Sequence, residues 1–386
     1  MRILCVGGGS GGHVTPVVAV IEQLQKVKPR ARIEFWCDRK YSAQSRRLMA
    51  PLKIPVKIVA AGKWRRYTNL PRLYRWFSLY HIWHTHLANL RDLVFLLAGF
   101  LQSFFKLIFK RPDVIFLKGG YVCLPVGLAA RLLKIPTVLH DSDTTPGLTN
   151  RILAKSARLI LTGAPTKFYP NYPAAKLRFV GIPVRPEFAK AGREGRTPAR
   201  RALNLADEKS LVVSVGGGLG ARYLNEAVLQ AARFLPEFNF VILTGQDDFA
   251  HLSGEAKSLS NVRAIAFAAE NYVDLIAEAD VVISRAGATS LAELALLSKP
   301  TILVPAPFLS GDHQTKNAKI YADNDAAILL SQKVLDDDAR PLVDALKKLL
   351  RDQNLRRNLA NHLHKFARPN AAAEIADLIV KAAENV

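Results

Sequence analysis

The sequence has few cysteines and no apolar leader. Cys5, Cys37 and Cys123 are far apart, odd in number and form no CxxC pair. This spacing argues against a disulfide framework and against a structural zinc site, and it favours a reducing compartment. The first strand-like residues run directly into glycines without an apolar stretch of useful length. No signal peptide is therefore predicted, and we expect the body of the protein to be cytoplasmic.

Acidic residues are scarce relative to basic ones. Asp and Glu total 32 against 54 Lys and Arg, which gives a formal net charge of +22 over 386 residues. Such an excess predicts an anionic partner: nucleic acid, acidic lipid or a phosphorylated ligand. No helix-turn-helix, RRM, OB or zinc pattern is present, and the basic residues concentrate beside tryptophans and apolar runs. We therefore expect no nucleic-acid partner.

Short β-branched runs alternate with longer helical stretches along the chain. Strands are expected at 2–6, 32–37, 56–60, 113–117, 137–140 and 158–162, and then at 211–215, 240–243, 280–284 and 301–304. Nearly continuous apolar strands separated by helices are typical of parallel sheets covered on both faces. The sequence therefore predicts an α/β protein with two Rossmann-like, doubly wound parallel-sheet domains.

The stretch at 192–201 is polar, basic and rich in Gly and Pro, which is the composition of a linker. We expect a first domain at 1–184, a second domain at 203–362 and a separate C-terminal helical segment at 363–386.

Two glycine-rich turns each follow the first strand of one half. GGGSGGH occupies 7–13 and GGGLGAR occupies 216–222, and neither matches the GxxxxGK[ST] pattern of a P-loop. Glycines let a backbone approach a ligand closely, and the N-terminus of the following helix offers N–H groups to an anion. The alternative is that both are simply tight strand–helix turns. His13, at the start of the first helix, is either a proton acceptor or a packing residue.

A third segment, SRAGATSLAE at 284–293, follows another buried strand. Ala288, Thr289 and Ser290 open the next helix, where N–H groups can meet phosphate. Glu293 falls one turn later. Its carboxylate suits the two hydroxyls of a ribose, or it is simply a favourable charge near a helix N-terminus.

Taken in order, these segments resemble the MurG family. Its members are inverting GT-B enzymes that add N-acetylglucosamine from UDP-N-acetylglucosamine to lipid I and so form lipid II in peptidoglycan synthesis. The resemblance covers nearly the whole chain. It rests on GGGSGGH, GGYV at 119–122, HDSDTTPGLTNR at 140–151, GIPVR at 181–185, GGGLGAR, SRAGATSLAE and DHQTKNA at 312–318.

The resemblance implies a role for each matching residue. His13 is the implied base at the acceptor C4 hydroxyl, and Glu293 holds the ribose. The implied donor-binding residues are Ser10, Gly11, Gly12, Asp143, Arg185, Gly218, Phe267, Ala268, Ala288, Thr289, Ser290, Glu293, His313 and Gln314. Among these, Arg185, Phe267 and Ala268 lie near uracil, residues 288–290 meet the diphosphate, and His313 and Gln314 read the sugar hydroxyls.

Four positions depart from the family pattern. Asp141 and Asp143 replace the Glu and Asn of HExN, Gly218 replaces the Ser of GGSxGAR, and Ile182 replaces the Asn of GNPVR. Residues 141–143 also spell DxD, a metal motif of the other large glycosyltransferase fold, whose strand pattern differs from this one. We expect neither a metal nor a cofactor. Two alternatives stay open: a GT-B glycolipid synthase that uses diacylglycerol, and an inactive membrane-bound scaffold.

Residues 63–111 combine tryptophan, basic charge and apolar runs, with Asp92 as their only acid. The apolar run at 93–101 is interrupted afterwards by Gln102, Ser103 and Lys106, so it falls short of the roughly 20 residues of a spanning helix. Trp, Tyr and Arg beside an apolar face suit the headgroup region of an anionic membrane. The alternative is a buried helical pair with a solvated basic side.

The predicted membrane contacts are Trp64, Arg65, Arg66, Arg72, Arg75, Trp76 and Trp83. The resemblance agrees with a peripheral location on the cytoplasmic face of the cell membrane.

Overall fold

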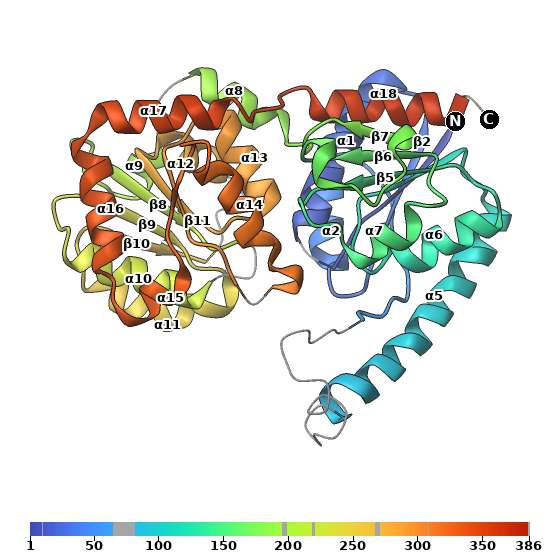
Figure 1. Cartoon of the computed structure of the whole chain (residues 1–386), viewed down its shortest axis with the longest axis horizontal. Helices are drawn as coiled ribbons and strands as arrows, with labels where there is room; N and C mark the ends of the chain where they lie inside the picture. Colours follow the sequence, from blue (N-terminus) through green and yellow to red (C-terminus); the bar gives the residue numbers. More distant parts are fainter. Residues whose placement is uncertain are drawn as a thin grey trace. The chain divides into compact units, whose positions relative to one another are not determined.

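Two α/β units make up the protein. The computed structural model describes residues 1–9, 11–64, 82–194, 199–217, 221–266, 271–307 and 309–384. The first unit comprises Met1–Pro183 and Asn370–Val386, and the second comprises Val184–Pro369. Each unit is a parallel sheet with helices on both faces (Figure 1). The predicted fold class, GT-B with two Rossmann-like domains, is confirmed.

The first unit has a seven-stranded parallel sheet in the order β3-β2-β1-β4-β5-β6-β7. Its strands are β1 (Arg2–Val6), β2 (Arg32–Cys37), β3 (Val56–Ile58), β4 (Val114–Leu117), β5 (Thr137–Asp141), β6 (Leu159–Thr162) and β7 (Leu177–Phe179). Its helices are α1 (Gly11–Val27), α2 (Ser42–Met49), η1 (Ile82–Leu87), α5 (Ala88–Phe109), α6 (Cys123–Leu132), α7 (Leu148–Leu153), η2 (Thr166–Phe168), η3 (Ala174–Lys176) and α18 (Ala371–Glu384). Strand order reverses between β1 and β4, and open parallel sheets bind ligands at the carboxyl ends beside such a reversal.

The second unit has a six-stranded parallel sheet in the order β10-β9-β8-β11-β12-β13, which reverses between β8 and β11. Its strands are β8 (Leu211–Val215), β9 (Asn239–Leu243), β10 (Val262–Ile265), β11 (Val281–Ser284), β12 (Thr301–Leu303) and β13 (Ile328–Leu329). Its first helices are α8 (Pro186–Glu194), α9 (Ala199–Ala202), α10 (Arg222–Arg233), α11 (Gln246–Lys257), α12 (Tyr272–Glu278) and α13 (Ala288–Leu297). They are followed by η4 (Ser310–Asp312), α14 (His313–Ala322), α15 (Gln332–Asp337), α16 (Arg340–Arg351) and α17 (Gln353–His364).

The C-terminal helix completes the core of the first unit. Ile375 and Ile379 of α18 are fully buried in one cluster with Val17 of α1 and Ile3 of β1. The predicted separate segment at 363–386 is therefore wrong: 363–369 end the second unit, and 370–386 belong to the first. A single amphipathic helix gains most of its stability from packing its apolar face, which explains why α18 docks.

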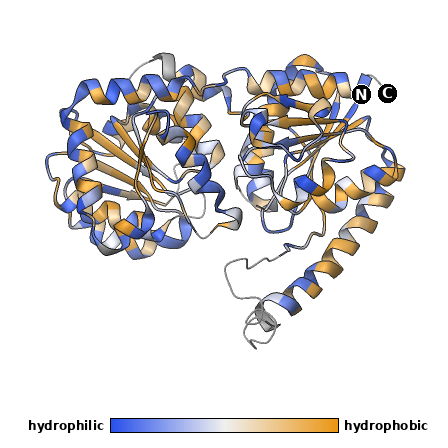
Figure 2. Cartoon of the chain, viewed as in Figure 1, coloured by the Kyte–Doolittle hydropathy of each residue, from blue (hydrophilic) through white to orange (hydrophobic). Residues whose placement is uncertain are grey.

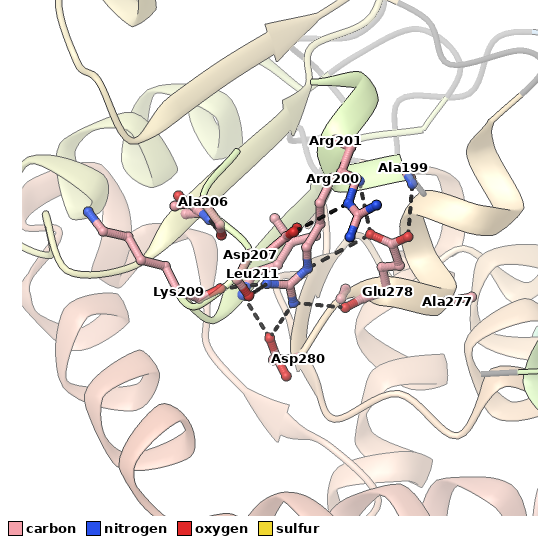
Figure 3. A network of polar contacts seen from close by, with 12 residues as sticks. Ala199, Arg200, Arg201, Ala206, Asp207, Lys209, Leu211, Ala277, Glu278 and Asp280 are labelled. Atoms are coloured by element: carbon pink, nitrogen blue, oxygen red, sulfur yellow. Dashed lines mark hydrogen bonds and ion pairs between the residues drawn. The ribbon is translucent and has the colours of Figure 1, made fainter. Parts of the chain in front are cut away.

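A buried polar network ties the start of the second unit to its sheet (Figure 3). The Glu278 carboxylate, at the end of α12, accepts the backbone N–H groups of Ala199 and Arg200 at 2.8 and 3.0 Å. The Arg200 guanidinium donates to Asp280 Oδ2 at 2.9 Å, and the same oxygen accepts the Leu211 N–H at 2.8 Å. Residues 199–202 are thus part of the second unit. That unit begins at Val184, and not at 203 as the linker composition predicted.

Helix α5 turns its small and polar residues towards the protein. Its buried residues are Asn89, Asp92, Gly99, Ser103 and Leu107. A Cβ on Gly99 would lie 1.8 Å from the Ala60 carbonyl oxygen, so glycine permits the contact with the segment after β3. Gln102 accepts the Ala60 N–H at 3.0 Å and donates to the Ile58 carbonyl at 3.1 Å, and Lys106 also donates to Ile58.

These polar contacts let the helix continue through the interruptions in the apolar run. By length and composition alone, Thr85–Phe109 is apolar and long enough to cross a membrane, which the apolar run at 93–101 did not suggest. Figure 2 shows α5 coloured as apolar over most of its length. Of the predicted membrane contacts, Trp64 is exposed. Arg65, Arg66, Arg72, Arg75 and Trp76 lie outside the described residues, as does the side chain of Trp83.

The polar network makes a prediction about stability. Glu278→Gln should lower the free energy of unfolding of the second unit by about 3 kcal/mol, because it leaves the buried Arg200 guanidinium undercompensated. The neighbouring Arg201 pairs with Asp207 at the surface, so Arg201→Gln should cost less than about 1 kcal/mol. Hydrogen exchange of β8 amides in urea measures this loss. Tryptophan fluorescence would not report on it, because every tryptophan lies in the first unit. Equal losses in the two variants would contradict a structural role for the network.

Candidate active site

The turns after β1 and β4 are in direct contact at the carboxyl edge of the first sheet. Gly120 has a φ of +84°, and a Cβ there would lie 2.2 Å from the Gly8 carbonyl oxygen. A Cβ on Gly8 would in turn lie 2.3 Å from Asp38 Oδ2. Glycine at 120 therefore lets the two backbones come together where strand order reverses, and glycine at 8 leaves room for the Asp38 carboxylate.

His13 lies in the first turn of α1, beside these turns. A Cβ on Gly119 would be 3.6 Å from His13 Cε1, and a Cβ on Gly120 would be 3.3 Å from His13 Cδ2. The same Gly119 position is 3.3 Å from Asn150 Oδ1 of α7. The imidazole therefore borders the GGYV turn and is close to Asn150. Gly11 and Gly12 open the same helix.

Asp38 fixes the first glycine turn, and the sequence did not single it out. Its carboxylate is buried, accepts the Gly9 N–H at 2.7 Å through Oδ2, and accepts the Tyr41 N–H at 3.2 Å through Oδ1. The Tyr121 hydroxyl also donates to Asp38, and its pKa is raised by burial and by the Asp38 charge. The Gly9 N–H is thus committed to a carboxylate. The one signal in the sequence is that Asp38 directly follows an apolar strand.

The two carboxyl groups of the DxD sequence lie at the end of β5, in Asp141, and just after it, in Asp143. Asp141 is buried and accepts the Tyr172 hydroxyl at 2.7 Å. Burial raises the pKa of Asp141 to about 7, against hydrogen bonds from Tyr172 and Asn150. The Tyr169 hydroxyl donates to the Asp143 carbonyl at 2.9 Å. Within the described ranges, no group of three His, Cys, Asp or Glu side chains is placed to hold a metal ion.

In the second unit, Glu293 lies in a cluster with Arg185 and two aromatic rings. The Tyr272 hydroxyl donates to Glu293 Oε2 at 3.3 Å, and the Tyr272 ring meets Phe188 edge-on at 6.0 Å. The Arg185 guanidinium lies 6.0 Å from the centre of the Phe188 ring and pairs with Glu187 at 3.1 Å. Burial raises the pKa of Glu293 to about 7, while Tyr272 and the Arg185 charge oppose the shift. Sequence reasoning found Arg185 and Glu293 but missed Tyr272.

Helix α13 begins at the point of strand reversal, directly after β11. Its N-cap is Gly287, which has no side chain to cap the helix, and its first turn contains no acidic residue. The N–H groups of residues 288–290 precede the first helical hydrogen bond, which joins the Leu291 N–H to the Gly287 carbonyl. Ala288, Thr289 and Ser290 therefore lie where the helix dipole favours an anion.

The remaining predicted residues differ in how far the structure describes them. His313 and Gln314 open α14, and the Gln314 side-chain oxygen accepts the Ala306 N–H at 3.0 Å. Gln314 thus holds the turn after β12, whatever its role towards a ligand. Ser10, Gly218, Phe267 and Ala268 lie outside the described residues.

Comparison with known proteins assigns both units to one family. The N-terminal domain of glycosyltransferase family 28 matches residues 3–162, and its C-terminal domain matches residues 211–377. The UDP-N-acetylglucosamine–N-acetylmuramyl-(pentapeptide) pyrophosphoryl-undecaprenol N-acetylglucosamine transferase of Exiguobacterium sp. is 32% identical over 98% of this chain and 99% of its own. The Desulforudis audaxviator enzyme of the same name is 33% identical, with 99% of each chain covered.

The chain belongs to the MurG family of glycosyltransferases. A crystal structure of Acinetobacter baumannii MurG superimposes with a TM-score of 0.70 and 26% identity, covering 98% of this chain and 99% of that one. The family assignment confirms the expected resemblance and makes this protein a glycosyltransferase.

The buried Glu293 of this MurG-family chain predicts a dependence of stability on pH. The pKa of Glu293 is raised from 4.5 to about 7 in the folded state, because burial favours the protonated carboxyl group. The stability of the fold is therefore unaffected by the ionisation of this group below pH 4.5, and it falls as the pH rises through about 7 and the buried group must ionise. Glu293→Gln should therefore raise the free energy of unfolding of the second unit by about 3 kcal/mol at pH 8 and much less at pH 5. Urea unfolding at the two pH values measures this. Glu255→Gln, in an exposed ion pair, is the control and should show no such gain. A gain that is equal at both pH values would contradict the burial effect.

Proposed function

We propose that the protein transfers N-acetylglucosamine, with inversion, from UDP-N-acetylglucosamine to the C4 hydroxyl of lipid-linked MurNAc-pentapeptide. The full-length relatives carry this activity in their names. The observation that carries the proposal is the position of His13 at the strand reversal of the first sheet, bordered by the turn after β4.

In this proposal the second unit binds the donor. The first turn of α13 offers N–H groups and a helix dipole to the diphosphate, and Glu293 accepts the ribose hydroxyls. Arg185 lies in the same cluster, and we assign it to the uracil of the donor. The leaving diphosphate is stabilised by these fixed dipoles, so we propose that transfer needs no divalent metal and no cofactor.

The first unit supplies the base. An alcohol is a poor nucleophile at neutral pH, and a positioned imidazole that takes its proton helps it to attack the anomeric carbon. His13 suits this role because Gly119 and Gly120 leave open backbone, and no bulky side chain, beside its ring. Asp38 holds the neighbouring Gly9 in place.

Replacement of His13 tests this role. His13→Ala should lower kcat by roughly 10²–10⁴-fold while the affinity for UDP-N-acetylglucosamine stays nearly unchanged, because most of the proposed donor contacts lie in the other unit. His13→Asn keeps polarity and similar size but cannot take the proton, so it should be impaired to a similar degree. Transfer kinetics and donor calorimetry measure the two quantities. Turnover by His13→Asn within a few-fold of the parent would place the base elsewhere.

Helix α5 is the part of the first unit that best fits a lipid surface. Its exposed apolar residues are Leu90, Leu93, Val94, Phe95, Leu97, Leu101, Phe105, Ile108 and Phe109. Six of them, at 90, 94, 97, 101, 105 and 108, follow the three- and four-residue spacing of one helix face. Their exposed fractions range from 47% to 61%, an unusual concentration for a surface in water.

The buried stripe of α5 favours lying on a bilayer over crossing it. Asp92 and Gln102 are held against the protein along one side of the helix, so only the opposite side is open to lipid. A helix surrounded by lipid would have to release these contacts and bury Asp92 in hydrocarbon. We therefore propose a peripheral location on the cytoplasmic face of the membrane, with one face of α5 in the lipid. Basic residues Lys110 and Arg111 follow the helix and favour anionic lipids.

Replacement of the outward face of α5 tests the membrane contact. Leu97→Asp combined with Leu101→Asp should weaken binding to vesicles that contain phosphatidylglycerol by at least about tenfold, because each leucine buried in lipid contributes about 1.5–3 kcal/mol. Phe234→Asp, at an exposed position of the second unit, is the matched control and should bind like the parent. Co-sedimentation at low and high salt measures both variants. Unchanged binding of the α5 variant at both salt concentrations would contradict the proposal.

A further inference from the structure

Lys118 is a buried ammonium to which the functional roles above assign nothing. It directly follows β4, its side chain is 1% exposed, and it is among the largest fully buried side chains in the described ranges. Its ammonium donates a hydrogen bond to Ser142 Oγ. Burying an ammonium is costly unless carboxylates compensate it, so its charge partners indicate its role.

The compensating charges lie at the end of β5 and directly after it. Burial lowers the pKa of Lys118 to about 8, and the charges of Asp143 first and Asp141 second oppose that shift. Lys118 in turn opposes the rise that burial imposes on the pKa of Asp141. One buried ammonium therefore contacts, through Ser142, the stretch 141–143 that carries two carboxyl groups.

This segment adjoins His13 through Asn150. The Asn150 side chain donates to the His140 carbonyl at 3.5 Å and hydrogen-bonds to Asp141. It also borders Gly119, next to the His13 ring. A continuous series of contacts thus joins Lys118 to His13. It runs through residues 140–143 and Asn150 along the carboxyl edge of the first sheet.

A bare carboxylate is unfavourable at this edge. In the proposed reaction both substrates carry a diphosphate, and like charges a few ångströms apart repel strongly where water is excluded. The MurG pattern has an uncharged Asn where this chain has Asp143. This chain therefore carries an additional negative charge in the segment and a buried positive charge below it.

We propose that Lys118 is a positioning residue that neutralises Asp143 and, through Ser142, fixes residues 141–143 beside His13. Asp143 then meets the anionic substrates as a charge-compensated hydrogen-bond acceptor. The inference rests on the proposed transferase function. It concerns the electrostatics of the segment, while His13 takes the proton.

A double-mutant cycle with Lys118→Met and Asp143→Asn tests the proposal. Methionine keeps an unbranched side chain of similar length and removes the charge. Lys118→Met should lower kcat/KM for UDP-N-acetylglucosamine or for the lipid-linked acceptor by at least about 30-fold, and its cost should be at least about tenfold smaller when Asp143 is already Asn. Lys57→Met is the control. Lys57 pairs with Glu34 on strands β3 and β2, at the other end of the sheet from β5, so this substitution should have the same effect in both backgrounds.

Two further readouts separate charge from packing. Lys118→Gln keeps a donor for Ser142 without the charge and should behave like Lys118→Met. In both variants the acid limb of the kcat/KM profile should move to higher pH, because Asp141 loses the cation that lowers its pKa while Asp143, Tyr172 and Asn150 still face it. A pure packing defect would leave that limb in place.

The outcomes are distinct. Equal costs of Lys118→Met in the two backgrounds, or a Lys118→Gln variant with parental kinetics, would overturn the proposal. If a Lys118 variant fails to fold, recovery of folding by Asp143→Asn supports charge compensation, and failure to recover overturns it. Absence of transfer by the parent enzyme itself would instead refute the proposed function.

Discussion

The contact between the turns after β1 and β4 is the constraint on which the rest of the first unit's site depends. Gly8 and Gly120 approach so closely that a single added carbon at either position would overlap a neighbouring oxygen. That approach places the start of α1, and with it His13, against the GGYV turn. Asp38 secures the arrangement from the side of β2 by holding the Gly9 N–H. A parallel sheet supplies the frame, because the carboxyl ends of β1, β2 and β4 meet at one edge.

Buried charged groups have two different roles in this protein. Glu278 and Asp280 surround Arg200 with matched partners, and the network anchors the start of the second unit to its sheet. Glu293 and Asp141 are buried with neutral hydroxyl partners, and burial dominates the pKa of each carboxyl group. A carboxyl group that raises the free energy of the folded state is a feature of sites that bind or react. Asp141 ends β5 and Glu293 lies on the helix that follows β11, near the carboxyl edges where the fold places ligands.

The central strands could be predicted from sequence because they are apolar on both faces, as in the run Leu211–Val215. The edge strands β7, β10 and β13 were missed because they are short and half-exposed, so their sequences do not form continuous apolar runs. The docking of α18 was missed because an amphipathic helix does not indicate in its own sequence which core it joins. Gln102 and Lys106 were interpreted as breaks in an apolar run, whereas both bind the Ile58 carbonyl at the end of β3.

The candidate site was predictable only where a local pattern marks it. The glycine turns after β1 and β4 and His13 at the start of α1 are local features, and the structure brings these three together. Asp38, Lys118 and Tyr272 come from separate strands and helices, and only tertiary packing shows what they contact. Their residue types are common, and no spacing in the sequence links them to the motifs.

The most direct measurement is incubation of the purified protein with radiolabelled UDP-N-acetylglucosamine and a mixture of a lipid I analogue and diacylglycerol, in the presence of chelator. The proposed function predicts label in a disaccharide lipid with the inverted β-linkage, formed without added metal. Label transferred to diacylglycerol instead, or no label transferred to lipid by the folded parent protein, would contradict it.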